Sequence, residues 1–131
     1  MPTPLDKPIR GVYTDSVRMM EMTKTERTLR NQVMSHIEDW EEEKGFGPCG
    51  AVAALLREQG YGQVAACEYD LHDGAYPFPH FVIVTDTGRI VDISNPFSGG
   101  SYVNLEILPD DEMPDLVEDG DIAYWRERLA A

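Results

Sequence analysis

Two cysteines and three histidines are the residues of this chain best suited to nucleophilic chemistry. One of them, Cys49, lies where the glycine-rich turn Gly45-Phe-Gly-Pro runs into the apolar segment Ala51 to Leu56. If that segment is a helix, backbone N–H groups and the positive end of its dipole point toward the sulfur, a setting that favours the nucleophilic thiolate. The backbone N–H of Cys49 is also a candidate donor to the oxyanion of an attacked carbonyl group.

A second pair of residues, His80 and Asp92, flanks the clearest hairpin of the sequence. Two runs rich in β-branched residues, Phe81–Val84 and Arg89–Ile93, enclose a turn that ends at Gly88. The register that places His80 opposite Asp92 puts both side chains on one face of the hairpin. A carboxylate beside an imidazole fixes its tautomer and stabilises the imidazolium that forms when a thiol gives up its proton.

Each of these residues also has a structural interpretation. A free cysteine is often a small buried residue of a core helix, and a lone histidine on a strand is often a hydrogen-bonded structural side chain. The combination of a cysteine at a helix start, a histidine on a strand and a carboxylate on the return strand favours catalysis by Cys49, His80 and Asp92.

The elements that must position these residues can be predicted from capping and periodicity. Thr23-Lys-Thr-Glu26 fits a capping box, and Leu29, Val33, Ile37 and Trp40 then share one face of a helix that ends at Gly45. Pro48 suits the first turn of the next helix, which Gly60 ends, and its apolar sequence predicts a central position. The remaining predicted elements are an extended arm at 1–12, a short helix within 13–22 capped by Asp15 or Ser16, strands at 63–69 and 102–108, a loop at 71–79 and a final helix at 122–129.

The composition excludes several classes of function. The chain has 131 residues, with 11 Lys and Arg against 24 Asp and Glu, a formal net charge of −13. This length predicts a single domain spanning 1–131. Because the positive charges are scattered among carboxylates, nucleic acid and anionic membranes are not expected partners. The first residues lack the apolar core expected of a signal peptide, no long apolar run is present, and the two cysteines suit free thiols, so a cytoplasmic location is expected.

The segment around Cys49 and the hairpin from His80 to Asp92 together resemble the papain-like superfamily. The resemblance is carried by Gly47-Pro-Cys49-Gly-Ala-Val-Ala-Ala-Leu-Leu and by His80-Phe-Val-Ile-Val-Thr-Asp-Thr-Gly-Arg-Ile-Val-Asp92. It is a likeness to small bacterial members: NlpC-type amidases, bacteriocin-leader-processing peptidases, transglutaminase-like proteins and arylamine acetyltransferases. It implies an α+β fold in which a central helix carries the cysteine at its N-terminus and packs on a small antiparallel sheet. It also implies that Cys49 is the nucleophile, His80 the general base and Asp92 the orienting residue, with Asn95 as the alternative third member.

The oxyanion side chain departs from this family pattern. Several relatives place a glutamine shortly before the cysteine, where this chain has Glu41-Glu-Glu-Lys44. Gln32 and its neighbour Asn31, a helix away, are the side-chain candidates. The substrate cleft is predicted to include Tyr76 and Phe78, which precede His80 on a loop, and Gly47, which leaves room for a substrate carbonyl.

These residues predict thiol-dependent acyl chemistry: hydrolysis of an amide, peptide or isopeptide, deamidation, or transglutamination. No cofactor or metal is expected, although Cys67 and His72 could join Cys49 and His80 in a zinc site. The expected substrate is a peptide or protein, and the net charge favours a basic one. The acidic run Glu38 to Glu43 is interpreted as a solvated face, with attraction of a basic substrate as the alternative. The competing function is a non-catalytic acidic binding or inhibitor protein, on a degenerate papain-like fold, that engages a basic partner.

Overall fold

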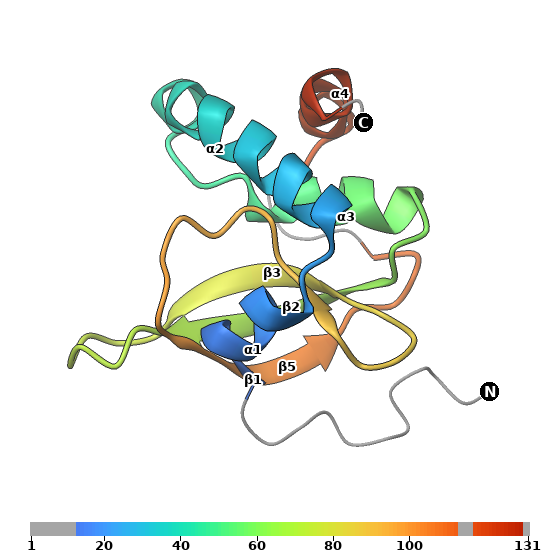
Figure 1. Ribbon diagram of the computed structural model, residues 1–131. Helices are drawn as coiled ribbons and strands as arrows, with labels where there is room; N and C mark the ends of the chain where they lie inside the picture. The colour runs from blue at the N-terminus through green and yellow to red at the C-terminus, as the bar shows by residue number, and fades with distance from the viewer. Residues whose placement is uncertain (1–12, 113–116, 130–131) are drawn as a thin grey trace.

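The fold combines four helices with a five-stranded antiparallel sheet (Figure 1). The structure is a computed structural model, and it describes residues 13–112 and 117–129. The strand order is β1-β5-β2-β3-β4. The predicted mixture of helices with a small antiparallel sheet is therefore confirmed, whereas the extended arm predicted at 1–12 lies outside the described residues. The elements are β1 (Tyr13–Thr14), α1 (Asp15–Glu21), α2 (Lys24–Lys44), α3 (Cys49–Glu58), β2 (Gln63–Asp70), β3 (Phe78–Val84), β4 (Ile90–Val91), β5 (Ser101–Ile107) and α4 (Asp119–Arg128).

The long helix α2 begins and ends where its sequence predicts. The Thr23 hydroxyl accepts a hydrogen bond from the backbone N–H of Glu26, and the Glu26 carboxylate accepts one from the N–H of Thr23. These bonds satisfy N–H groups that have no partner within the helix. At the other end Gly45 adopts a left-handed conformation, with φ of 80°, that terminates the helix at low cost.

Helix α3 begins at Cys49 and is buried along most of its length. Pro48 is its N-cap, and Gly50 and all residues from Ala51 to Leu56 are buried. The helix packs on β3 and on α4, and α2, α3 and α4 lie on the same side of the sheet in Figure 1. This burial on several sides explains why its sequence is apolar around the whole circumference.

The hairpin of β3 and β4 differs from the predicted register by two residues. Ile83 pairs with Val91 and Val84 with Ile90, so His80 is not directly opposite Asp92. Side chains alternate between faces with a period of two, so a shift of two residues leaves Asp92 on the same face as His80. The prediction that His80 and Asp92 pair directly is wrong, but the two side chains still lie on the same face of the hairpin.

Two hydrophobic clusters cover the two faces of the sheet. The cluster on the helix side includes Ile83 of β3, together with side chains of α2, α3 and α4. The cluster on the other face includes Val82 and Val84, with Tyr69 and Tyr102. Two smaller expectations are wrong: Thr14, not Asp15 or Ser16, caps α1, and α4 begins at Asp119, before the expected start. None of the helices in residues 13–112 and 117–129 has the length and hydrophobicity needed to cross a membrane.

Candidate functional site

Cys49 is the first residue of α3 and is partly exposed. No side chain caps this helix start, and Val52 makes the first intrahelical hydrogen bond, from its N–H to the carbonyl oxygen of Pro48, at 2.9 Å. The backbone N–H groups of the first helical turn have no partner within a helix. They are therefore free to donate to a negative charge that develops beside the cysteine.

His80 lies in β3 between Cys49 and Asp92. Its side chain is 5% exposed, and its Nε2 lies 2.8 Å from Oδ2 of Asp92. The ring and the Cys49 side chain line the same cavity, and Cys49 is one of the groups that raise the pKa of His80. Since Nε2 faces Asp92, Nδ1 is the ring nitrogen left for Cys49. The structure thus brings together the three residues that the sequence predicts as a triad.

The charges of His80 and Asp92 stabilise each other. Burial disfavours a charged imidazole, but the Asp92 carboxylate and the Cys49 side chain outweigh it and raise the pKa of His80 to about 10. Burial also disfavours a charged carboxylate, but His80, Tyr102 and Arg18 outweigh it and lower the pKa of Asp92 to about 2. At neutral pH the pair is therefore an imidazolium beside a carboxylate.

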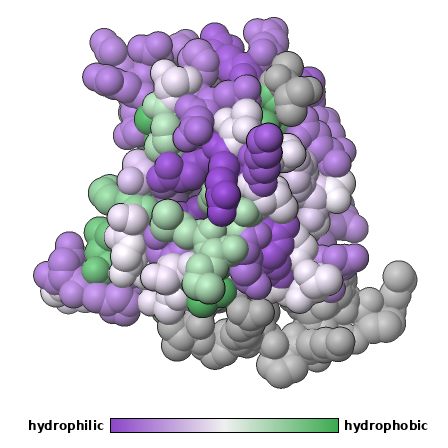
Figure 2. All heavy atoms as spheres, in the orientation of Figure 1, coloured by the Kyte–Doolittle hydropathy of each residue, from purple (hydrophilic) through white to green (hydrophobic). Residues whose placement is uncertain are grey.

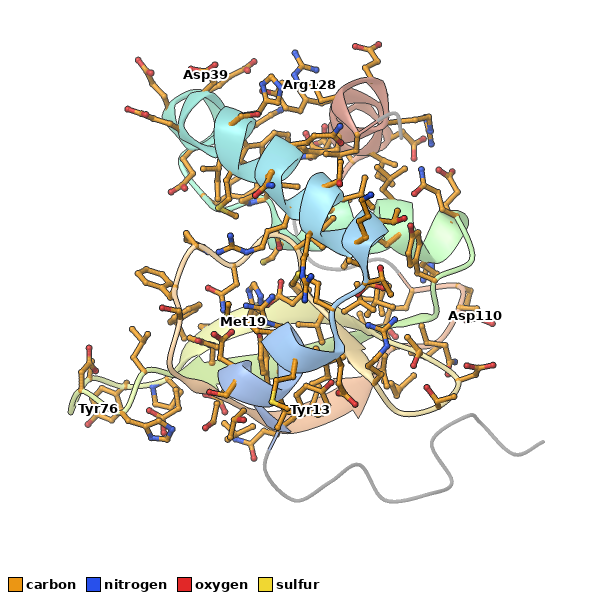
Figure 3. The ribbon with its side chains drawn as sticks, in the orientation of Figure 1. Tyr13, Met19, Asp39, Tyr76, Asp110 and Arg128 are labelled. Atoms are coloured by element: carbon orange, nitrogen blue, oxygen red, sulfur yellow. The ribbon has the colours of Figure 1, made fainter. Side chains whose placement is uncertain are left out.

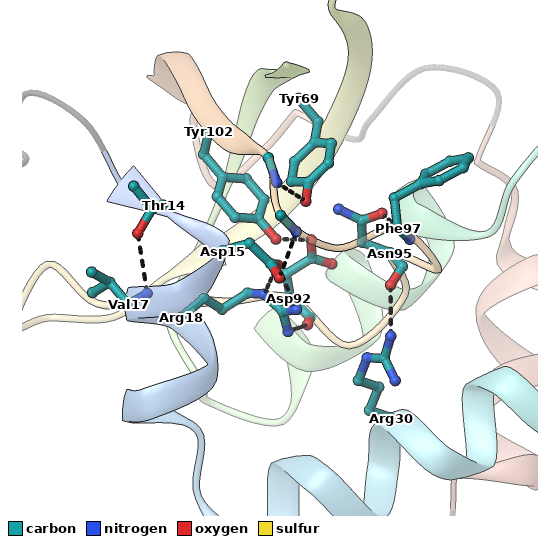
Figure 4. A network of polar contacts seen from close by, with 12 residues as sticks. Thr14, Asp15, Val17, Arg18, Arg30, Tyr69, Asp92, Asn95, Phe97 and Tyr102 are labelled. Atoms are coloured by element: carbon teal, nitrogen blue, oxygen red, sulfur yellow. Dashed lines mark hydrogen bonds and ion pairs between the residues drawn. The ribbon is translucent and has the colours of Figure 1, made fainter. Parts of the chain in front are cut away.

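Asp92 is held by two residues that the sequence analysis did not identify (Figure 4). The Tyr102 hydroxyl donates a hydrogen bond of 2.7 Å to Oδ2 of Asp92. Arg18 donates from Nη1 to the Asp92 backbone oxygen at 2.8 Å. A third donor, the N–H of Ser94, lies 3.3 Å from Oδ1. Both oxygens of the carboxylate and its backbone carbonyl are thus fixed in position.

Arg18 is itself fixed by a buried ion pair. Its Nη2 and Nε lie 2.6 Å and 2.9 Å from Oδ1 of Asp15, and both side chains are 2% exposed. Asp15 also accepts a hydrogen bond from the N–H of Gly99, at 3.3 Å. The start of α1 is thereby connected to the loop that follows Asp92, and this network orders the side of the site away from α3.

Two cavities open on either side of Cys49. The first, of about 240 Å³, is lined by Cys49 and His80 together with Gly47 and Phe78. Its other walls are Ile37 and Glu41 of α2, Pro48 and Pro79, and the loop Ser94 to Phe97. The second, of about 350 Å³, includes Cys49 and Gly47 and is mostly apolar, with Trp40, Phe46 and Phe81 in its walls. A ligand in either cavity reaches the sulfur.

Of four further residues predicted for the site, the structure places some at the first cavity and one away from it. Gly47 and Phe78 line the first cavity, in agreement with the predicted cleft. Tyr76 is 97% exposed at the tip of the loop between β2 and β3, projects away from the molecule and lines neither cavity (Figure 3). Asn95 lines the first cavity, but its Oδ1 accepts from the N–H of Phe97 and Asp92 occupies the position beside His80. The prediction for Tyr76 is therefore wrong, and Asp92 is favoured over Asn95.

Gln32 is not at the site, contrary to the prediction. The cavity wall on α2 is formed by Ile37 and Glu41. Gln32 precedes Ile37 by five residues, which at 3.6 residues per turn turns its side chain about 140° around the helix axis. Among the candidates from the sequence, the backbone N–H of Cys49 is the oxyanion donor that remains at the cavity.

Cys67 and His72 do not join the site as metal ligands. His72 is exposed, and its Nε2 lies 2.8 Å from the Ser101 hydroxyl. Cys67 is a buried free thiol on β2 opposite His80, and burial raises its pKa far above the ordinary value. No group of three or more His, Cys, Asp or Glu side chains is arranged for a metal ion within the described segments.

Comparisons of this chain with protein-family models, with curated proteins and with solved structures give no match.

Proposed function

We propose that this protein performs thiol-dependent acyl chemistry with a papain-like arrangement of Cys49, His80 and Asp92. The observation that carries the proposal is the position of His80, which hydrogen-bonds the Asp92 carboxylate and lines the same cavity as Cys49. Nucleophile, base and orienting group in such a chain are the requirement for covalent catalysis by a thiol. The two cavities at Cys49 provide room for groups on either side of the attacked carbonyl.

The reaction would begin with an imidazolium at His80 and a thiolate at Cys49. The sulfur attacks the carbonyl carbon of an amide or ester, and the carbonyl electron pair moves to oxygen, where the Cys49 N–H donates to it. Collapse of this intermediate breaks the bond to the leaving amine or alcohol, which takes the proton from His80. The product is a thioester at Cys49, with His80 neutral.

The second half of the reaction restores the Cys49 thiolate and the His80 imidazolium. Neutral His80 accepts a proton from water or from an acceptor amine, whose lone pair attacks the thioester carbon, and the sulfur leaves as thiolate. Water gives hydrolysis or deamidation, and an amine gives acyl transfer. Asp92 stabilises the imidazolium in both halves, because it is held as a carboxylate at neutral pH.

The proposed substrate is a peptide or protein with a basic group near the site. Glu41 lines the first cavity, and Glu38, Asp39, Glu42 and Glu43 lie on neighbouring turns of α2. Because these carboxylates lie at the C-terminal end of a helix, where the dipole is negative, they add to the negative potential near Cys49.

Trapping of an acyl-enzyme tests the proposal. The protein is mixed with p-nitrophenyl acetate, quenched with acid and digested, and acetylated Cys49 is quantified by mass spectrometry. Acetylation of Cys49 is expected at a rate that His80→Ala lowers by about 10² or more. Equal acetylation in wild type and His80→Ala would contradict the proposal, as would label confined to lysines.

A second candidate function, a non-catalytic binding protein, is favoured by the position of Gln32. None of the described residues that line the Cys49 cavities is a glutamine. A domain that lacks this donor retains a shaped, acidic cleft for a basic partner. The acyl-enzyme experiment separates the two functions, because a binding protein gives no His80-dependent acetylation of Cys49.

A further inference from the structure

A third cavity, of about 450 Å³, opens between α1, the first half of α2 and the loop that follows Asp92. Its walls combine arginine and methionine side chains, a pairing unlike either cavity at Cys49. We refer to it as the arginine pocket; it is lined by Arg18, Met19, Met22, Arg27, Arg30, Asn31 and Ser98.

Two of these arginines lack a carboxylate partner among the described residues. Arg18 is paired with Asp15, but neither Arg27 nor Arg30 forms an ion pair with a carboxylate of the described residues. Arg30 donates one hydrogen bond, from Nη2 to the backbone oxygen of Asn95 at 3.2 Å, and Arg27 is exposed. Residues three apart on a helix are neighbours on its surface, so the two guanidinium groups share one face. In a chain with a net charge of −13, Arg27 and Arg30 thus form a local concentration of positive charge.

The arginine pocket adjoins the Cys49 site through a single loop. Arg18 and Arg30 bond the backbone oxygens of Asp92 and Asn95, at the start of this loop. Ser94 to Phe97 of the same loop line the first cavity. Helix α2 also contributes to both places, with Arg27 and Arg30 at the arginine pocket and Ile37 and Glu41 at the cavity.

Methionine completes the surface on the other side of the pocket. Met19 is 53% exposed and belongs to α1, where Figure 3 labels it. Figure 2, in the same orientation, shows strongly hydrophilic side chains over α2 directly above a hydrophobic patch over α1. Methionine adapts its shape to apolar groups, whereas guanidinium forks pair with carboxylate oxygens.

We infer that the arginine pocket binds the side-chain carboxylate of an acidic residue, with an apolar neighbour, in the peptide whose carbonyl reaches Cys49. This inference rests on the proposed function, since it assigns part of the substrate. It also refines the charge of that substrate. Glu41 and the other carboxylates at the C-terminal end of α2 attract a basic group. Arg27 and Arg30, near the N-terminal end of α2, attract an acidic group. The proposed peptide therefore carries both charges.

A titration with a matched pair of peptides tests the pocket. The probes are acetyl-Ala-Leu-Glu-Ala-amide and acetyl-Ala-Leu-Gln-Ala-amide, which differ only in the carboxylate. They are added to isotope-labelled Cys49→Ala protein, and the arginine Nε–H signals are followed by NMR. The Glu peptide is expected to shift the signals of Arg27 and Arg30 in a saturable manner and to bind at least about tenfold more tightly than the Gln peptide.

The matched variants are Arg27→Gln and Lys24→Gln. Both remove one positive charge from the exposed surface of α2, but Lys24 does not line the pocket. Arg27→Gln is expected to weaken Glu-peptide binding about tenfold, and Lys24→Gln by less than about threefold, through general charge alone. Equal binding of the two peptides, or equal effects of the two variants, would overturn the inference. Tighter binding of inorganic phosphate than of the Glu peptide would overturn it in favour of a phosphorylated ligand.

A second measurement connects the pocket with Cys49. Saturating Glu peptide is expected to slow alkylation of Cys49 in the wild-type protein, because the same chain passes through the first cavity. Binding without protection would overturn the assignment to the substrate. The titration uses a protein without the Cys49 thiol, so its failure and the failure of acyl-enzyme formation are observed independently.

Discussion

The hydroxyl of Tyr102 and Nε2 of His80 contact the same oxygen of Asp92, at 2.7 Å and 2.8 Å. The carboxylate is thus fixed from two sides, by a neutral donor on β5 and by a charged donor on β3. All three side chains are almost completely buried, so each of these hydrogen bonds acts in a medium that screens it weakly.

Replacement of Tyr102 by phenylalanine is expected to destabilise the protein and to weaken catalysis. A hydrogen bond to a charged group contributes about 1.5–3 kcal/mol, and its loss leaves Asp92 with one donor fewer. The pKa of Asp92 is then expected to rise, because Tyr102 is one of the groups that lower it. Urea denaturation measures the stability, and the rate of Cys49 acetylation measures the catalytic effect.

Tyr69→Phe is the matched control for this variant. Tyr69 is equally buried, but its hydroxyl accepts a hydrogen bond from the N–H of Gly100 and does not touch Asp92. It is expected to cost about 0.5–1.5 kcal/mol of stability while leaving the acetylation rate nearly unchanged. Equal slowing of acetylation by both variants would show that Tyr102 acts through packing alone.

The protonation state of His80 gives a second prediction. Histidine ring signals in NMR are expected to show His80 still protonated at pH 8.5, since Asp92 and Cys49 raise its pKa to about 10. In Asp92→Asn the main stabilising charge is absent and burial prevails, so the pKa falls well below 10. An ordinary titration of His80 near pH 6.5 in the wild-type protein would contradict this account of the site.

The lowered pKa of Asp92 predicts a loss of stability in acid. Its folded pKa of about 2 lies below the unfolded value of 3.8, so the unfolded state binds more protons between these values. The stabilisation by Asp92 is therefore present above pH 4 and is lost as the pH falls toward 2. The gap in free energy of unfolding between wild type and Asp92→Asn is expected to narrow over that range, measured by denaturant titration at each pH. A constant gap would contradict a charged Asp92.

The raised pKa of His80 gives the opposite dependence of stability on pH. The stabilisation that it contributes is complete below pH 6.5 and is lost as the pH rises through about 10.

The buried pair of Asp15 and Arg18 gives a prediction about stability alone. Asp15→Ala leaves the Arg18 guanidinium buried without its carboxylate, and breaking such a pair typically costs about 3–5 kcal/mol. Glu58→Ala breaks the exposed pair of Glu58 with Arg126, which is expected to contribute about 0–1 kcal/mol. Denaturant midpoints measure both variants, and similar losses in the two would contradict the structural role assigned to Arg18.

Local sequence signals predicted the elements well and their long-range contacts poorly. The capping box at Thr23, the stop at Gly45 and the helix start at Cys49 depend on residues within a few positions of each other, and the structure contains all three. Asp92 was also predicted to lie near His80, because the two residues belong to one hairpin. The register was wrong by two residues, since only two residue pairs join β3 to β4 and the turn sequence alone does not fix it.

The network around Asp92 had no such local signal. Arg18 lies 74 positions before Asp92, and Tyr102 belongs to β5, which pairs with β1 and β2 rather than with β4. From the sequence, Asp15 and Arg18 are expected to be ordinary surface residues of a short helix, although a spacing of three residues does allow an ion pair. Tyr76 and Phe78 illustrate the same limit. The structure starts β3 at Phe78, inside the predicted loop 71–79, and the sequence does not reveal that Phe78 lines the cavity while Tyr76 is exposed.

The pH dependence of Cys49 alkylation tests the central claim most directly. Iodoacetamide is added between about pH 5 and 9, and the modification of Cys49 and Cys67 is followed by mass spectrometry in wild type and His80→Ala. The account predicts that Cys49 of the wild-type protein reacts faster than Cys49 of His80→Ala over this pH range, and that buried Cys67 stays unmodified. An inert Cys49, or a Cys49 whose profile is the same in both proteins, would contradict an activated thiol at this site.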